Sequence, residues 1–134
     1  MNIRKEVIMQ EGFVKVLEDL MVREMPIKKS LEISESIDVI AKEIVTVERT
    51  QQALAKRYGK KDDKGELVPD ANGKITFATV EDRDKCESDM KDLVAGDLEI
   101  PLKEKIVFYD DENLTPQKAR FLKDLIVIEE RPKK

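Results

Sequence analysis

Histidine is absent from this sequence of 134 residues, and cysteine occurs only once. Histidine is the commonest general base and the commonest protein metal ligand, so its absence excludes Ser–His and Cys–His nucleophile pairs within the chain. The single Cys86 excludes an intramolecular disulfide and a cysteine zinc site, and it suits a reducing, intracellular setting. With 29 acidic residues, carboxylate pairs arise by chance at many spacings. The composition therefore predicts a protein that is not an enzyme.

Glycines are few and scattered, with five in the chain, and tryptophan is absent. No glycine-rich phosphate loop or dinucleotide-binding pattern can be formed from them. A calcium loop around Asp70–Gly73 fails, because Val68 and Thr79 would occupy the first and last ligand positions. A looser cation site at residues 110–113 stays open, although a turn leading to Thr115 is favoured. We expect no cofactor and no metal.

Long apolar runs are also missing, since no segment approaches the roughly 20 residues that span a bilayer. The first residues are charged and show no apolar signal core, so we expect a protein that is not secreted and has no membrane partner. Hydrophobic and charged residues each make up 40% of the chain, and aromatics only 4%. This composition predicts an aliphatic, helical interior beneath a strongly charged surface.

The most informative positive feature is a heptad seam of apolar residues on one predicted helix. Its members follow steps of four and three residues, and one of them is polar: Ile33, Ile37, Ile40, Ile44, Val47, Gln51, Leu54 and Tyr58. Such a stripe faces a single partner along several turns, either a helix of the same chain or another subunit. We take these residues as a candidate protein interface, in which Gln51 could set the register.

Two helices are predicted around this seam. Apolar spacing predicts one over residues 13–25, and Pro26 stops it and opens a second over residues 27–58, ~48 Å long. The first is too short to cover the seam. The rest of the seam must be covered by residues 2–12, a later helix, a C-terminal strand or another subunit. Residues 3–9 could either extend the first helix or form a strand.

Shorter signals organise the remainder of the chain. Asn72-Gly73 between two apolar pairs predicts a β-hairpin. Thr79 is the predicted cap of a third helix, which ends at Gly96. Alternating apolar residues then predict strands near residues 98–102 and 106–108. Thr115-Pro116 predicts the start of a last helix, which runs through Leu125 and is followed by a loose tail from Glu129.

The predicted fold is mainly α, of the α+β type. A long antiparallel helical hairpin (residues 1–61) carries a small β-hairpin at its tip (residues 62–78), and a smaller helix-strand-helix part follows (residues 79–134). We expect one continuous domain.

One basic cluster, Lys56, Arg57, Lys60 and Lys61, lies where the long helix should end. Positive charge there compensates the negative end of the helix dipole, which is a sufficient structural reason for the cluster. A nucleic-acid contact is the alternative, and we consider nucleic acid an unfavoured partner.

Three segments resemble a family of small, uncharacterised proteins encoded in tailed-phage and prophage genomes, often near tail or morphogenesis genes. They are Met25-Pro26-Ile27-Lys28, the run from Ala53 to Gly65, which is similar to the family's K-Y-G-x-K-D-x-x-G passage, and the stretch from Leu98 to Pro116. The lysine-rich end at Lys133-Lys134 departs from the family. The resemblance implies a virion-associated or assembly role in the host cytoplasm or the virion.

Our leading hypothesis is a non-enzymatic phage structural or assembly protein that acts through protein–protein contacts. Its expected partners are further copies of itself or other phage structural proteins. The alternatives are a phage-encoded regulator whose acidic second half binds a host protein, and a weak nucleic-acid-binding accessory protein.

Overall fold

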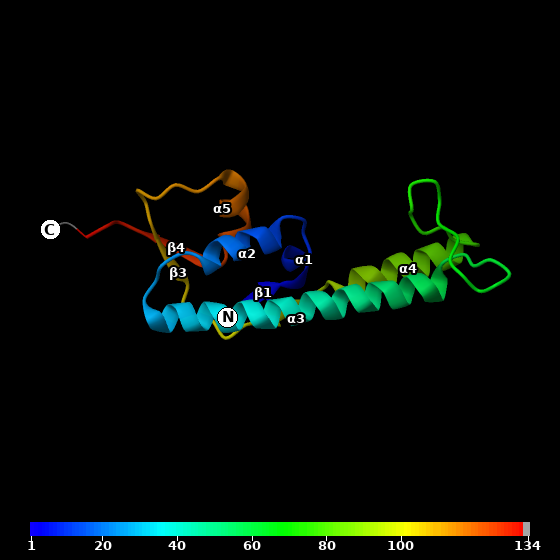
Figure 1. Cartoon of the computed structure of the whole chain (residues 1–134), viewed down its shortest axis with the longest axis horizontal. Helices are drawn as coiled ribbons and strands as arrows, with labels where there is room; N and C mark the ends of the chain where they lie inside the picture. Colours follow the sequence, from blue (N-terminus) through cyan, green and yellow to red (C-terminus); the bar gives the residue numbers. More distant parts are fainter. Residues whose placement is uncertain (133–134) are drawn as a thin grey trace. The chain divides into compact units, whose positions relative to one another are not determined.

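The computed structural model describes residues 1–132 and shows a mainly helical chain with two small two-stranded sheets (Figure 1). This confirms the coarse fold prediction. The elements in chain order are β1 (Asn2–Arg4), α1 (Lys5–Ile8), α2 (Phe13–Met21), α3 (Ile27–Tyr58), α4 (Val80–Leu93), β2 (Asp97–Glu99), β3 (Ile106–Tyr109), α5 (Pro116–Leu122) and β4 (Ile126–Glu129).

The chain divides into two compact units, and α3 runs from one into the other. Met1–Lys42 together with Gly96–Lys134 forms the first, which we call the N/C unit. Glu43–Ala95 forms the second, which we call the middle unit.

The N-terminal residues of the N/C unit, for which the sequence left helix or strand open, form a strand followed by a short separate helix. Strand β1 pairs antiparallel with β2, which places Ile3 opposite Leu98. The Lys5 N–H donates to the Gly96 carbonyl at 3.1 Å and starts α1. Gly12 separates α1 from α2 at a φ of +89°, a conformation that glycine adopts without steric cost.

Helix α2 buries one face inside the N/C unit, partly against α5 and partly against the first half of α3. Phe13, Val16, Leu17 and Leu20 supply that face, and α2 ends at Met21, four residues earlier than predicted. A small cavity is bordered by Leu17 and Leu20 of α2 and by Ile33 and Ile40 of α3, which shows that the two helices are neighbours. Pro26 then accepts from the Ser30 N–H at 3.0 Å, as expected for a proline at the start of a helix.

The C-terminal part of the N/C unit contains a strand that the sequence did not predict. Strands β3 and β4 pair in parallel, with Ile106 opposite Ile126 and Tyr109 opposite Glu129. We expected a helix through Leu125 and a loose tail from Glu129. The helix ends at Leu122 instead, and β4 runs over Ile126–Glu129, so it includes the first residue of that tail. The Thr115 cap is confirmed, because its side chain accepts from the Lys118 N–H at 3.2 Å.

In the middle unit, α4 packs against the second half of α3 in a hairpin-like arrangement (Figure 1). The Tyr58 hydroxyl of α3 donates to the Asp89 carboxylate of α4 at 2.9 Å. Thr79 caps α4, as predicted, by accepting from the Asp82 N–H. The long helix therefore forms its hairpin-like pair with α4.

The segment between α3 and α4 forms two similar loops, and the predicted β-hairpin is not confirmed. Asp62 Oδ1 accepts from the N–H groups of Lys64 and Glu66. In the second loop, Asp70 Oδ1 accepts from the N–H groups of Asn72 and Lys74. Gly65 and Gly73 close the two turns at φ of +80° and +78°. The pairing is limited to isolated antiparallel bridges, 61 with 67 and 69 with 75. Aspartate side chains thus bind the N–H groups that a longer ladder would use.

No helix among residues 1–132 combines the length and the apolar character needed to cross a membrane.

Candidate functional site

The heptad seam is covered within the chain. Ile33, Ile40 and Val47 are at most 5% exposed, and the other five seam residues are half-buried. Leu17, Leu20, Ile100 and Leu125 surround the first turns of the seam in the N/C unit. Little seam surface is left for another protein, and the seam as an interface stays a prediction.

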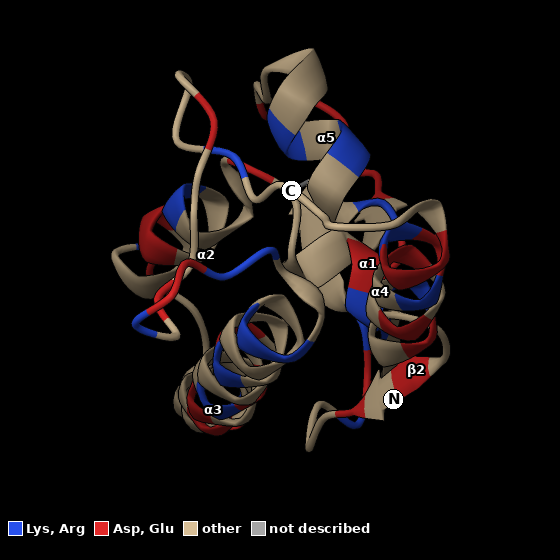
Figure 2. Cartoon of the chain, turned by 90° about the vertical axis from the view of Figure 1, so that its right-hand side faces the viewer, with Lys and Arg blue, Asp and Glu red and all other residues tan. Residues whose placement is uncertain are grey.

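The basic cluster at the end of α3 is fully on the surface. Lys56, Arg57, Lys60 and Lys61 are all exposed. Arg57 lies 5.2 Å from the centre of the Tyr58 ring, and acidic residues of the loop at 62–66 follow directly. Basic and acidic residues are interspersed along α3 and α4 (Figure 2). The nucleic-acid contact therefore also stays a prediction.

A groove of about 600 Å³ lies in the N/C unit. One wall is the connection between α2 and α3 with the first turns of α3, and the other is the segment that leads into β3 together with β3 itself. The lining residues are Arg23, Glu24, Met25, Pro26, Lys28, Lys29, Glu32, Lys103, Glu104, Ile106, Val107 and Tyr109. This volume lies within the ~300–1,000 Å³ that is usual for ligand sites.

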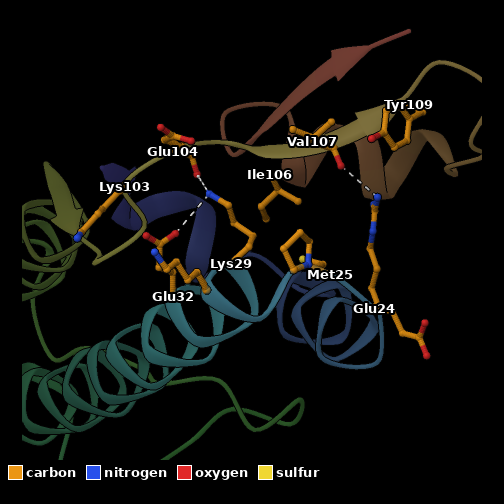
Figure 3. A pocket seen from close by; sticks show the side chains of 12 residues that line it. Glu24, Met25, Lys29, Glu32, Lys103, Glu104, Ile106, Val107 and Tyr109 are labelled. Atoms are coloured by element: carbon orange, nitrogen blue, oxygen red, sulfur yellow. Dashed lines mark hydrogen bonds and ion pairs between the residues drawn. The ribbon is translucent and has the colours of Figure 1, made fainter. Parts of the chain in front are cut away.

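Two long cationic side chains bridge the groove from its helical wall to the backbone of the opposite wall. Lys29 Nζ donates to the Glu104 carbonyl at 2.8 Å and pairs with the Glu32 carboxylate at 3.3 Å (Figure 3). Arg23 donates to the Val107 carbonyl at 3.1 Å. Ile106 points toward Met25 between these two bridges (Figure 3). The interior of the groove is therefore apolar, and its ends are polar.

Arg23 is held in place by further contacts. Its guanidinium lies 3.6 Å from the centre of the Phe108 ring and pairs with the Glu112 carboxylate at 3.2 Å. The Glu112 carboxylate in turn accepts from the Tyr109 N–H at 2.6 Å. This ion pair therefore occupies two backbone groups on the outer edge of β3, which limits uncontrolled pairing at an open strand edge.

One backbone group on that edge has no partner. The N–H groups of Ile106 and Asp110 face β4, where they donate to the carbonyls of Leu125 and Glu129. Successive groups along a strand alternate in direction, so the Val107 N–H faces the groove together with its carbonyl. No acceptor for this N–H is recorded among residues 1–132. The groove wall thus presents a free main-chain donor.

Large apolar side chains are exposed beside the groove, where the chain passes from α2 to α3. Met21, Val22, Ile27 and Leu31 are 57%, 82%, 77% and 59% exposed. We call these four residues the apolar corner. Ile27 and Leu31 are one helical turn apart, so they share a face of α3.

Two titratable groups outside the groove, Cys86 and Asp111, have shifted pKa values with structural causes. Cys86 is buried, and that burial raises the pKa of its thiol, which agrees with a small core residue. In the acidic turn at 110–113, Arg131 binds the Asp111 carboxylate at 2.8 Å and holds the pKa of that carboxyl below its usual range. No group of three or more potential metal ligands occurs among residues 1–132.

Sequence reasoning found the seam and the basic cluster but missed the groove. Arg23 and Val107 are 84 residues apart, and Lys29 and Glu104 are 75 apart. Nothing in the local pattern marks these pairs. All four residues of the apolar corner lie in the predicted helices, but their exposure cannot be inferred from apolar spacing.

Comparisons with protein-family models, with curated proteins and with solved structures give no match to this chain.

Proposed function

We propose that the chain is a non-enzymatic phage structural or assembly protein that acts through protein–protein contacts as a homo-oligomer. The observation that supports this most directly is the apolar corner. Four large apolar side chains are exposed between residues 21 and 31, and large exposed apolar surface on a protein marks sites of association. The phage assignment rests on the three resembling segments, and it places the protein in the host cytoplasm or the virion.

The apolar corner suits self-association in two ways. Its side chains extend from α2 across the connection into α3, so a partner would contact two elements at once. Val22 and Ile27 together expose most of their side chains, and each would gain roughly 1.5–3 kcal/mol if it were fully buried. A second copy brings the same surface, as in the twofold interfaces that are commonest among homo-oligomers.

Light scattering of the purified protein tests the proposal. Over a range of concentrations we expect a mass above the 15.4 kDa of one chain, and we expect Val22→Glu with Ile27→Glu to return the mass to 15.4 kDa. Val45→Glu with Val80→Glu is the matched control, because those residues are exposed apolar positions of the middle unit. A wild-type protein that stays at 15.4 kDa, or a double variant with unchanged mass, would overturn the proposal.

A further inference from the structure

We propose that the groove between residues 23–32 and residues 103–109 binds an extended acidic peptide segment of a partner protein. This inference rests on the proposed function, since it assumes that the chain works by binding protein. It assigns the partner's chemistry and a site distinct from the apolar corner.

The wall formed by β3 favours an extended peptide over a compact small molecule. Extended peptides bind strands through main-chain hydrogen bonds, and on this edge of β3 one donor is free while two neighbouring groups are occupied. The free Val107 N–H can donate to one peptide carbonyl, while the Val107 carbonyl stays hydrogen-bonded to Arg23. The ion pair of Arg23 with Glu112 fixes this arrangement of β3 in the free protein.

The interior between the two bridging side chains accepts one aliphatic side chain of that peptide. Met25, Pro26 and Ile106 line this part of the groove. Successive side chains of a strand point to opposite faces, so every second peptide residue would point into the groove. An alternating sequence would place its aliphatic side chains in the groove and its acidic side chains along the rim, within reach of the exposed Lys28 and Lys103.

The charges around the groove favour an acidic peptide. Lys28 and Lys103 line it, and neither has a side-chain partner recorded among residues 1–132. The acidic residues that line the groove repel a peptide carboxylate only weakly. Glu32 is paired with Lys29, and the Glu24 carboxylate points away from Ile106 and Val107 (Figure 3). Glu104 is the remaining carboxylate, and its side chain points away from Met25 (Figure 3). Two unpaired lysines therefore remain available to peptide carboxylates.

The test is a titration of the ¹⁵N-labelled full chain with acetyl-Glu-Val-Glu-Val-Glu-amide, followed by NMR. We expect saturable shifts of the amides of residues 23–32 and 103–109, with Val107 among the largest. The basic counterpart acetyl-Lys-Val-Lys-Val-Lys-amide should produce no saturable shift. Added salt should weaken binding, because exposed charge pairs are screened.

Charge reversal provides the variants. Lys28→Glu with Lys103→Glu should weaken binding about tenfold, from the loss of two surface ion pairs. Lys15→Glu with Lys85→Glu makes the same change in net charge at exposed lysines outside the groove, and it should leave binding unchanged. Val107→Pro removes the free N–H without removing a bond to β4, and it should also abolish binding.

Absence of saturable shifts with the wild-type chain, shifts confined to other residues, or equal binding of the basic peptide would overturn this inference. Mass measurements on the same samples separate it from the proposed function. If the chain is an oligomer that does not bind the peptide, only the groove assignment is wrong. If the chain is a monomer that binds the peptide, only self-association through the apolar corner is wrong.

Discussion

The N/C unit and the middle unit are built in different ways, although α3 contributes to both. The middle unit supplies Val47, Ala55 and Cys86 to the buried apolar set, and the other buried apolar side chains of residues 1–132 belong to the N/C unit. Side-chain hydrogen bonds in the loops and at the Thr79 cap support the middle unit. The N/C unit depends on apolar packing, and the middle unit depends more on local hydrogen bonds.

The same difference separates the candidate binding surfaces. The groove and the apolar corner both belong to the N/C unit. The exposed basic cluster belongs to the middle unit, where opposite charges lie beside it. A packed unit can hold a groove in a fixed geometry, and this explains why the stronger binding candidates lie there.

The largest expected effect is on the packing of the N/C unit. Phe13 is fully buried, and its ring meets that of Phe121 edge to face at 5.7 Å. Phe13→Ala should lower the free energy of unfolding by about 3–5 kcal/mol, because it removes the ring and leaves a cavity. Urea unfolding followed by circular dichroism measures this loss.

Val14→Ala is the neighbouring control, since Val14 is 49% exposed on the same helix. It should change the free energy of unfolding by no more than about 0.5 kcal/mol. Equal losses from the two substitutions would contradict the assignment of the main core to the N/C unit.

A smaller effect is expected in the middle unit from Gly59→Ala. A Cβ at Gly59 would lie 2.5 Å from the Ala55 carbonyl oxygen and 2.6 Å from Leu67 Cδ2. The substitution should cost about 1–3 kcal/mol through overpacking. Hydrogen exchange should show faster exchange for amides of residues 60–76, with the N/C unit unchanged.

Gly73→Asn is the control for Gly59, because a side chain at residue 73 meets no atom within 4 Å and asparagine tolerates its positive φ. Its exchange rates should stay close to those of the wild type. If Gly59→Ala speeds exchange equally in both units, the two units open as one, and the contrast between them fails.

The smallest effect concerns ionisation of Tyr58. Its hydrogen bond to the Asp89 carboxylate raises the pKa of the phenol above the usual value of 10.0. The protonated phenol is therefore favoured in the folded state, so its contribution is present below pH 10 and is lost as the pH rises through the raised pKa.

Absorbance titration of a Tyr109→Phe background, which keeps one phenol, measures this pKa. We expect Asp89→Asn to lower it. An unchanged titration in the Asp89→Asn variant would show that the bond between α3 and α4 does not influence Tyr58.

The sequence predicted those elements whose signals are local. The Thr79 and Thr115 caps depend on a partner three residues away, and both are confirmed. The length of α3 followed from Pro26 and from continuous helical spacing. Strand β4 was missed because its pairing with β3 joins residues 20 positions apart, and an apolar run such as 126–128 does not show its partner.

The twin loops could have been found, although they were not. Asp62 and Gly65 have the same spacing as Asp70 and Gly73, and this repeat precedes each positive-φ turn. The predicted hairpin at Asn72-Gly73 placed one turn correctly but ignored the competing aspartates. The groove had no such signal, since it forms only when segments about 80 residues apart meet.

The most direct test of the account is the mass in solution of two double variants, one in each unit. We predict that Val22→Glu with Ile27→Glu gives a folded chain of 15.4 kDa, and that Val45→Glu with Val80→Glu keeps the larger mass of the wild type. If only the middle-unit variant lost the larger mass, contacts with other copies would lie in the middle unit, and the central claim would be wrong.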